Sequence, residues 1–175
     1  MVGMIFMFKN KMLAISLLLA STAAGVEIRP INFTESEITW LAKNVYFEAR
    51  NQGIAGQISV AHVTLNRVKD RRFPNTIKEV VTQGLTRNSW RDGVPFPIKW
   101  KCQFSWYCDG KKDEITNWES FNKIKRLMFT FTANDSIIDI TEGATHYHAD
   151  YVFPDWAVTK TKTIEIEDHI FYRWE

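Results

Sequence analysis

The chain has 175 residues, of which 45% are hydrophobic, 24% charged and 14% aromatic, a composition typical of one folded globular domain and not of a disordered or fibrous protein. Its 22 basic and 20 acidic residues give a net charge of +2. Two of the basic residues and none of the acidic ones lie in the first 24 positions, so residues 25–175 carry no net charge. This balance argues against a nucleic-acid-binding protein.

The first 24 residues have the pattern of a secretory signal peptide. Two lysines precede an apolar run at 12–20, and small residues follow at 21–25. We expect cleavage after Ala23 or Ala24, export to the periplasm, the cell wall or the medium, and a mature catalytic domain of residues 25–175. A retained leader that tethers the chain to a membrane is the alternative, but the apolar run is shorter than the roughly 20 residues that span a bilayer. We expect no stable membrane insertion after cleavage.

Apolar residues at helical spacing predict three helices at the start of the mature region. Thr34 and Thr76 each stand three residues before a glutamate, which is the spacing of a capping box. Helices are therefore predicted over 35–50 and from Thr76 to near Gly84, with another over 55–69 between them.

Helical and strand periodicity both disappear over residues 85–110, which contain three tryptophans, Trp90, Trp100 and Trp106. We predict a long loop that forms one wall of a cleft. Cys102 and Cys108 lie in this stretch, and an exported chain permits a local disulfide between them. Two free thiols are the alternative, and two cysteines are too few for a structural zinc site.

The second half of the chain predicts a fourth helix and then strands. Thr116 and Glu119 have the capping-box spacing ahead of the helix. Strand-like patterns follow at 143–148, 163–166 and 169–172. The predicted class is α+β: a helical bundle with a small antiparallel sheet at its C-terminal end.

Glu48 is the candidate catalytic acid. On the first predicted helix it lies seven residues after Leu41 and three after Val45, so its carboxyl flanks the apolar stripe. Partial burial there would raise the pKa of the carboxyl and let it donate a proton near neutral pH, as glycosidic bond cleavage requires. On spacing alone, an ordinary exposed helical glutamate is the alternative.

Several short blocks, in order along the chain, resemble the SleB/CwlJ-type cell-wall hydrolases. The likeness runs from about Ile38 to Arg173, and the ordered set is far more specific than any single block. The blocks are Tyr46-Phe47-Glu48-Ala49-Arg50, Gly56-Gln57-Ile58-Ser59-Val60-Ala61, Leu65-Asn66-Arg67-Val68, Phe73-Pro74, Gln103-Phe104-Ser105-Trp106, Gly143-Ala144-Thr145-His146-Tyr147-His148, Pro154-Asp155-Trp156 and His169-Ile170-Phe171-Tyr172.

The resemblance implies a lysozyme-like domain related to lytic transglycosylases, which cleaves peptidoglycan between N-acetylmuramic acid and N-acetylglucosamine without a metal or cofactor. It implies that Glu48 acts first as acid and then as base, leaving a 1,6-anhydromuramic product. A hydrolysing muramidase is the near alternative. Gln52 departs from many relatives, which carry a second glutamate there. Relatives often carry a wall-binding module; none is visible here, so we expect the cleft to supply the affinity.

Further residues in the resembling blocks are expected to line the cleft and bind sugar groups. Trp106 and Trp156 are candidates for stacking on sugar rings, with core packing as the alternative. For His169 and Tyr172, the alternative to sugar binding is that they only complete the packing of the sheet. The full predicted set is Gln103, Ser105, Trp106, Tyr107, Thr145, His146, Tyr147, His148, Trp156, His169 and Tyr172.

Two other functions compete with glycan cleavage. His146 and His148 alternate on a predicted strand, and His169 could join them to bind zinc, as in an amidase that cuts the sugar-to-peptide bond. A non-catalytic wall-binding module that retains the fold is the other alternative. In each case the expected partner is the peptidoglycan strand, and we expect a monomer.

Overall fold

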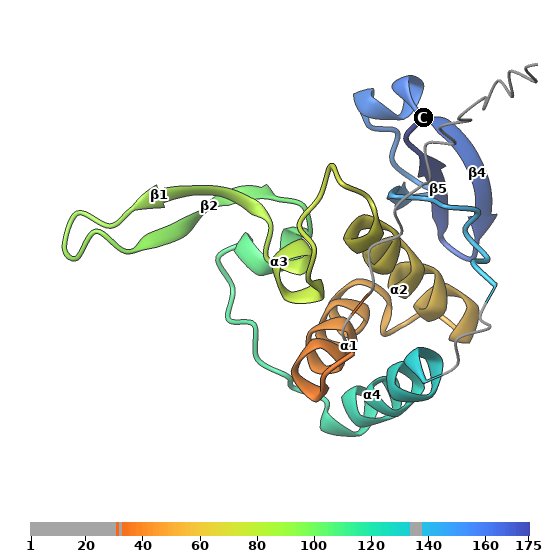
Figure 1. Cartoon of the computed structure of the whole chain (residues 1–175), viewed down its shortest axis with the longest axis horizontal. Coiled ribbons are helices and arrows are strands. Elements are labelled where there is room, and N and C mark those ends of the chain that lie inside the picture. The colour runs from red at the N-terminus through yellow and green to blue at the C-terminus, as the bar shows by residue number, and fades with distance from the viewer. Residues whose placement is uncertain (1–30, 32, 134–137) are drawn as a thin grey trace, which may run out of the picture.

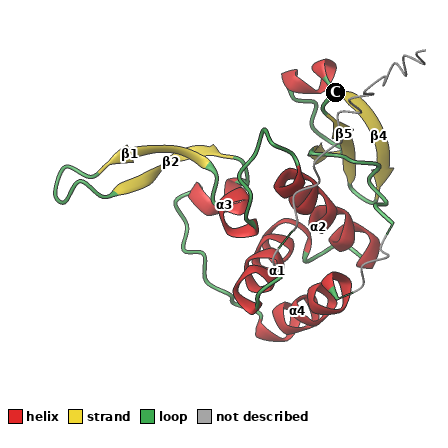
Figure 2. Ribbon diagram, viewed as in Figure 1, coloured by secondary structure: helices red, strands yellow, loops and turns green. Residues whose placement is uncertain are grey.

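The structure, a computed structural model, describes residues 31, 33–133 and 138–175 (Figure 1). A group of helices occupies the centre, a small sheet lies at one side, and a two-stranded hairpin projects from the opposite side (Figure 2). The predicted α+β class is confirmed. The leader expected at residues 1–24 lies outside the described residues.

Four helices form the body of the protein: α1 (Glu35–Ala49), α2 (Ile54–Lys69), α3 (Ile77–Val81) and α4 (Trp118–Thr132). Helix α1 packs against each of the other three, so its apolar stripe is the centre of the core. The largest fully buried apolar side chains on these helices are Tyr46, Leu41, Ile77, Met128, Val45, Val60, Val63, Val68, Val80 and Val81.

Thr34 and Thr76 cap the starts of α1 and α3, as predicted. The Thr34 hydroxyl accepts a hydrogen bond from the backbone N–H of Glu37 at 3.2 Å, and the Thr76 hydroxyl accepts one from Glu79 at 3.2 Å. The Glu37 carboxylate does not return to its own helix start, because it accepts the backbone N–H of Ile77 at 2.6 Å. The first turns of α1 and α3 are thereby joined.

The predicted cap of α4 is wrong by one residue. Asn117 is the N-cap, and its side-chain oxygen accepts the backbone N–H of Ser120 at 2.9 Å. The Thr116 hydroxyl lies 3.4 Å from the Tyr46 hydroxyl instead. Trp118, in the first turn, is 62% exposed and does not join the buried face of this helix.

The long loop predicted over 85–110 is wrong: most of it is an antiparallel hairpin of β1 (Gly84–Asn88) and β2 (Pro95–Cys102). Both strands are largely exposed, so their sequence lacks the apolar and polar alternation that a half-buried strand shows. The expected disulfide is present, and it ties the end of β2 at Cys102 to Cys108 in the short helix η1 (Ser105–Cys108).

The C-terminal sheet has the order β3-β5-β4 and is antiparallel, as predicted. Its strands are β3 (His146–Ala149), β4 (Thr161–Ile166) and β5 (His169–Arg173), and the short helix η2 (Asp155–Thr159) precedes β4. Phe171 in β5 packs with Val63 of α2, which fixes one face of the sheet against the helices. Among the helices within the described ranges, none is long and apolar enough to cross a bilayer.

Candidate active site

Glu48 lies in the last turn of α1, at the edge of the core. Leu41 and Val45, which precede it on the same side of the helix, are fully buried, whereas Glu48 itself is half-buried. This is the flanking position that the sequence predicts. The carboxyl is thus partly removed from water but remains at the boundary between core and solvent.

Strand β3 brings a tyrosine to this carboxyl. The Tyr147 hydroxyl donates a hydrogen bond to Oε2 of Glu48 at 2.8 Å. Tyr147 pairs with Phe171 across the sheet and so points to the helix-facing side. Among the hydrogen bonds of the described residues, this is the one that Glu48 accepts.

Helix α2 adds a buried arginine. Arg67 is 4% exposed, its Nε donates to the backbone carbonyl of Thr145 at 2.7 Å, and its guanidinium lies over the Phe104 ring at 4.9 Å and the Phe73 ring at 5.3 Å. Burial lowers the pKa of Arg67 to about 10, which still leaves it charged at neutral pH. Arg67 belongs to a block that resembles the family, Leu65-Asn66-Arg67-Val68, but no role is predicted for it. A basic residue among apolar neighbours on the second predicted helix is the sequence signal that could have identified it.

The surroundings of Glu48 shift its pKa in two directions. Burial, the largest cause, raises the pKa of the carboxyl because the ionised form loses hydration. The Tyr147 hydrogen bond and the positive charge of Arg67 oppose that increase. The net direction is upward, which favours the protonated form that a general acid requires.

The three histidines proposed as zinc ligands do not meet. His169 pairs with Ala149 and therefore faces the same side of the sheet as Tyr147, whereas His146 and His148 face the other side. In the part of the chain that the structure describes, no three histidine, cysteine or acidic side chains gather as a metal site. The register of the sheet thus contradicts the zinc-amidase arrangement.

His148 and Tyr172 form a buried pair on the outer face. Nδ1 of His148 lies 2.9 Å from the Ala149 carbonyl, and Nε2 lies 3.0 Å from the Tyr172 hydroxyl. Because a carbonyl can only accept, Nδ1 carries the proton and Nε2 accepts from Tyr172. The half-buried Trp156 packs on both rings, 5.7 Å from His148 and 5.4 Å from Tyr172. His148, Tyr172 and Trp156, all predicted to contact sugar, thus pack against one another.

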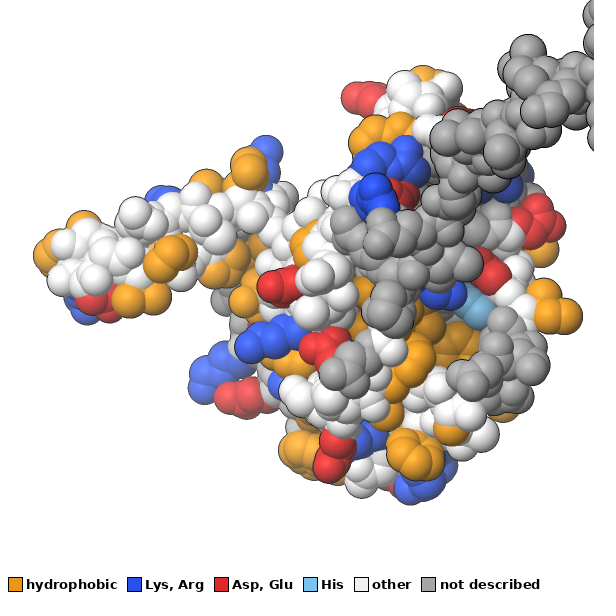
Figure 3. All heavy atoms as spheres, viewed as in Figure 1, with side chains coloured by type: hydrophobic (Ala, Val, Ile, Leu, Met, Phe, Trp, Pro, Cys, Tyr) orange, Lys and Arg blue, Asp and Glu red, His pale blue; other side chains and the backbone are white. Residues whose placement is uncertain are grey.

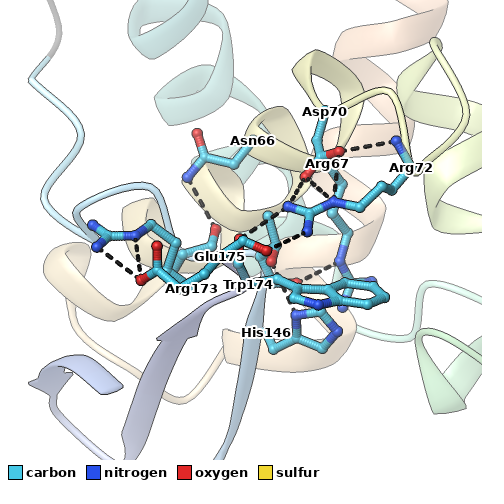
Figure 4. A network of polar contacts seen from close by, with 10 residues as sticks. Asn66, Arg67, Asp70, Arg72, His146, Arg173, Trp174 and Glu175 are labelled. Carbon is cyan, nitrogen blue, oxygen red and sulfur yellow. Dashed lines mark hydrogen bonds and ion pairs between the residues drawn. The ribbon is translucent and has the colours of Figure 1, made fainter. Parts of the chain in front are cut away.

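His146 lies beside the same cluster and next to the C-terminal residues. Figure 4 shows it near Trp174, and the centres of the two rings are 5.8 Å apart. The Arg72 guanidinium donates to the Asp70 carboxylate at 2.6 Å and to the Trp174 backbone carbonyl at 2.9 Å. Nδ1 of His146 also lies 2.9 Å from the Thr145 hydroxyl. Burial and nearby positive charges, Arg67 foremost, lower the pKa of His146 to about 3. It is therefore neutral at neutral pH.

The sequence profile described as cell wall hydrolase matches residues 51–172. The chain belongs to the cell wall hydrolase family. Arg67 and Tyr147 lie inside the matched region, and Glu48 lies just before it.

Curated relatives match a shorter stretch of this cell wall hydrolase. The spore cortex-lytic enzyme of Bacillus subtilis (strain 168) is 38% identical over 64 residues, which is 37% of this chain and 21% of the relative. The Bacillus cereus spore cortex-lytic enzyme is 36% identical over 64 residues, or 25% of its length. The matched segment is thus about a quarter of these relatives or less.

Solved structures match most of the cell wall hydrolase fold. The catalytic domain of the Bacillus cereus SleB protein is 26% identical with a TM-score of 0.56, over 82% of this chain and 94% of that one. The catalytic domain of the germination-specific lytic transglycosylase SleB from Bacillus anthracis is 27% identical with a TM-score of 0.59, over 82% and 99%. The lysozyme-like fold that the resemblance implies is confirmed.

The remaining predicted contacts lie around η1, where two are exposed and one is buried. Gln103 and Ser105 are exposed, and Tyr107 is half-buried. Trp106 is 7% exposed, stacks on Phe47 at 4.5 Å and donates from Nε1 to the Asn44 side chain at 2.9 Å. Its packing is that of a core residue, which favours the alternative to sugar stacking.

A cavity of about 590 Å³ lies elsewhere, between the start of α1 and α4. Glu35 lines it, and thirteen residues of helix place Glu48 about 20 Å further along the axis. Glu35 is exposed and pairs with Lys125 at 3.3 Å. Without a desolvated carboxyl, this cavity lacks the acid that Glu48 provides.

Proposed function

We propose that the chain cleaves the glycan strand of peptidoglycan between N-acetylmuramic acid and N-acetylglucosamine, with Glu48 as its catalytic acid. The observation that carries the proposal is the half-buried Glu48 carboxyl, held by Tyr147 at 2.8 Å, with its pKa raised. Membership of the cell wall hydrolase family and the likeness to a lytic transglycosylase domain support it.

The proposed reaction is a lytic transglycosylation. Glu48 gives its proton to the glycosidic oxygen as the bond to C1 of the muramic sugar breaks, so the leaving sugar departs as a neutral alcohol. The Glu48 carboxylate then takes the proton from the C6 hydroxyl of the same muramic sugar while that oxygen bonds to C1. The product is a 1,6-anhydro ring, no water is consumed, and Glu48 ends protonated.

A single carboxylate suffices for this scheme, and the surroundings of Glu48 agree with that requirement. The charged group that acts on the pKa of Glu48 is Arg67, and no described carboxylate contributes to it. Glycosidases that use two carboxylates place them about 5 to 9.5 Å apart. Gln52, where many relatives have glutamate, hydrogen bonds to Asp168 at 2.7 Å instead.

Mass spectrometry of the products released from purified peptidoglycan tests the proposal. We expect anhydromuramic ends from the native chain and a loss of turnover of about a hundredfold or more in Glu48→Gln. Glu35→Gln, an exposed glutamate on the same helix, is the matched control and should retain activity. Reducing muramic ends would mean a hydrolysing muramidase. Full activity in Glu48→Gln, or free stem peptides with intact glycan, would refute the assignment.

The place of action is proposed on the same basis. The family acts on a polymer outside the cytoplasm, which supports export. We propose that residues 1–24 are then removed and that residues 25–175 act as a monomeric catalytic domain. Mass spectrometry of the secreted chain, with its N-terminus read, tests the cleavage after Ala23 or Ala24. Light scattering of the same sample tests the monomer.

A further inference from the structure

The β1–β2 hairpin is an arm with a fixed base. At its tip the backbone N–H of Ser89 donates to the Val94 carbonyl at 2.9 Å, and Gly93 takes a positive φ of 72°. At its base Gly84 pairs with Cys102 so closely that a Cβ there would lie 2.8 Å from the Cys102 sulfur. The disulfide joins this base to η1, whose Trp106 lies in the core. The arm therefore has a defined direction.

The arm exposes large apolar side chains that the fold does not use. Trp90, at the tip, is 88% exposed, and Val94 beside it is 58% exposed. Further along the arm, Leu85, Phe96 and Trp100 are 62%, 36% and 59% exposed. Figure 3 shows hydrophobic side chains at several places along the projecting arm. Apolar groups gathered on one narrow projection indicate a contact surface.

Positive charge is concentrated on the same arm. Residues 84–102 hold four basic residues and one acidic residue, a net charge of +3, whereas residues 31–175 as a whole are neutral. The basic groups lie over the rings: Arg91 is 5.0 Å from Trp90, and Arg87 is 4.8 Å from Phe96. The arm is thus cationic and aromatic, and the rest of the described fold is anionic by comparison.

We propose that the hairpin tip binds the headgroup region of an anionic lipid bilayer. Tryptophan favours the membrane interface, and lysine and arginine beside it attract lipid phosphates. A narrow tip can enter the headgroup layer while the body stays in water. This contact is peripheral and does not depend on the assignment of Glu48.

The direction of the arm favours a lipid surface over an extension of the proposed glycan site at Glu48. The sheet that carries Tyr147 lies on one side of the helices and the arm projects from the other (Figure 1). A glycan strand bound at Glu48 would need rings continuous with that site, and Trp90 is at the far end of the molecule. Binding at the tip leaves the Glu48 side free to face the wall.

Quenching of tryptophan fluorescence by brominated lipids tests the contact directly. The full chain is mixed with vesicles of 30% phosphatidylglycerol and 70% brominated phosphatidylcholine. We expect quenching in the native chain and in Trp118→Phe, and its loss in Trp90→Phe. Trp118 is the matched control because it is 62% exposed on α4. Equal quenching in the two variants would mean that another part of the chain contacts the vesicle, and it would overturn the proposal. Absence of quenching in the native chain would overturn it as well.

The charged half of the proposal has its own test. Arg87→Gln with Arg91→Gln should weaken partition into these vesicles about tenfold at low salt, because each basic residue near an anionic surface adds to binding. Lys111→Gln with Lys112→Gln, which removes two exposed charges outside the arm, should have a much smaller effect. Equal losses would show nonspecific attraction and overturn the role of the arm.

Sedimentation with purified peptidoglycan separates a lipid partner from a wall partner. Trp90→Phe should bind peptidoglycan as the native chain does and release products from soluble glycan fragments at the native rate. Loss of peptidoglycan binding with vesicle quenching intact would make the arm a wall-binding element and refute the lipid proposal.

Discussion

At the residue scale, the Glu48 carboxyl is controlled by a few neighbours. Burial favours its neutral form, while Tyr147 and Arg67 favour the ionised form. Burial is the largest effect, so the pKa is raised, but the two opposing groups limit the increase. Such a balance lets one carboxyl donate a proton and later accept one.

Tyr147→Phe tests this balance through pH dependence. The first step needs protonated Glu48, so activity falls as pH rises through the pKa of that carboxyl. The Tyr147 hydrogen bond lowers this pKa; its removal should raise the pKa and move the upper limb of the pH profile to higher pH. Turnover at the optimum should fall about tenfold, because the carboxyl loses its orientation.

The matched control for that variant is Tyr151→Phe, since Tyr151 is 84% exposed. It should leave both the rate and the pH profile unchanged. An upper limb that stays in place or moves to lower pH in Tyr147→Phe would contradict the role given to the hydroxyl.

Gln52→Glu tests why a neutral side chain stands at this position. The Gln52 amide nitrogen donates to the Asp168 carboxylate at 2.7 Å, and its oxygen lies 3.4 Å from the Asp168 N–H. Glutamate would remove the donor and place two carboxylates together. We expect a loss of about 1 kcal/mol in the free energy of unfolding, measured in urea.

Asp168→Asn in the same chain should restore that stability, because an amide can donate to the new glutamate. Failure of the rescue would show that the loss arises elsewhere. A gain in activity in Gln52→Glu alone would instead revive a catalytic second carboxylate.

The sequence predicts Glu48 as the candidate acid and Tyr147 as a cleft residue, but it does not predict that the two side chains meet. Glu48 could be placed because its position depends on one helix and on the family block that contains it. The Tyr147 contact spans 99 residues of sequence, and Arg67 reaches the site through tertiary packing. Both residues belong to blocks that resemble the family, but neither contact follows from local periodicity.

At the scale of elements, the turn between β4 and β5 attaches the sheet to the helices. The Glu167 carboxylate accepts the backbone N–H of Gly53 at 2.7 Å and of Gly56 at 3.1 Å, at the start of α2. A Cβ on Gly56 would lie 2.8 Å from this carboxylate. The two glycines therefore allow a carboxylate from the sheet to cap the helix, where the helix dipole favours negative charge.

Glu167→Ala should weaken this attachment. We expect a loss of about 1 to 2 kcal/mol of stability, which is typical of a lost helix cap. Activity should also fall, because the same sheet carries Tyr147. Glu165→Ala, on the exposed side of β4 with Lys162 as its partner, is the matched control. Equal unfolding midpoints for the two variants would refute the capping role.

The elements that the sequence predicted best were those with local signals. Helices α1 and α2 follow from apolar spacing, and the Thr34 and Thr76 caps formed as expected. The hairpin was not predicted because both faces of its strands are largely exposed, so the sequence shows no alternation of apolar and polar residues. The zinc alternative, in which His169 joins His146 and His148, fails because His169 pairs with Ala149 and faces the opposite side of the sheet, and single-strand alternation does not reveal this pairing.

At the scale of the whole molecule, the disulfide connects the arm to the helix that carries Glu48. Cys102 ends the arm, and Trp106 inside the same small loop donates to Asn44 at 2.9 Å. Asn44 lies one turn before Glu48 on α1. The disulfide and the Trp106–Asn44 hydrogen bond thus link the base of the arm to the helix that carries Glu48, the proposed acid. Arg67 and Tyr147 lie on α2 and β3, outside this chain of contacts.

Replacing Cys102 and Cys108 with serine should therefore affect stability more than chemistry. A bridge between residues six positions apart restricts the unfolded chain and so adds about 2 kcal/mol to the free energy of unfolding. Its loss should lower the Tm by about 5 °C for a domain of this size. Turnover of soluble glycan fragments should remain within about threefold of the native rate. A reductant should lower the Tm of the native chain similarly and leave the serine variant unchanged. An unaltered Tm in both would refute the bracing role, because the arm base and η1 would then be held by their packing alone.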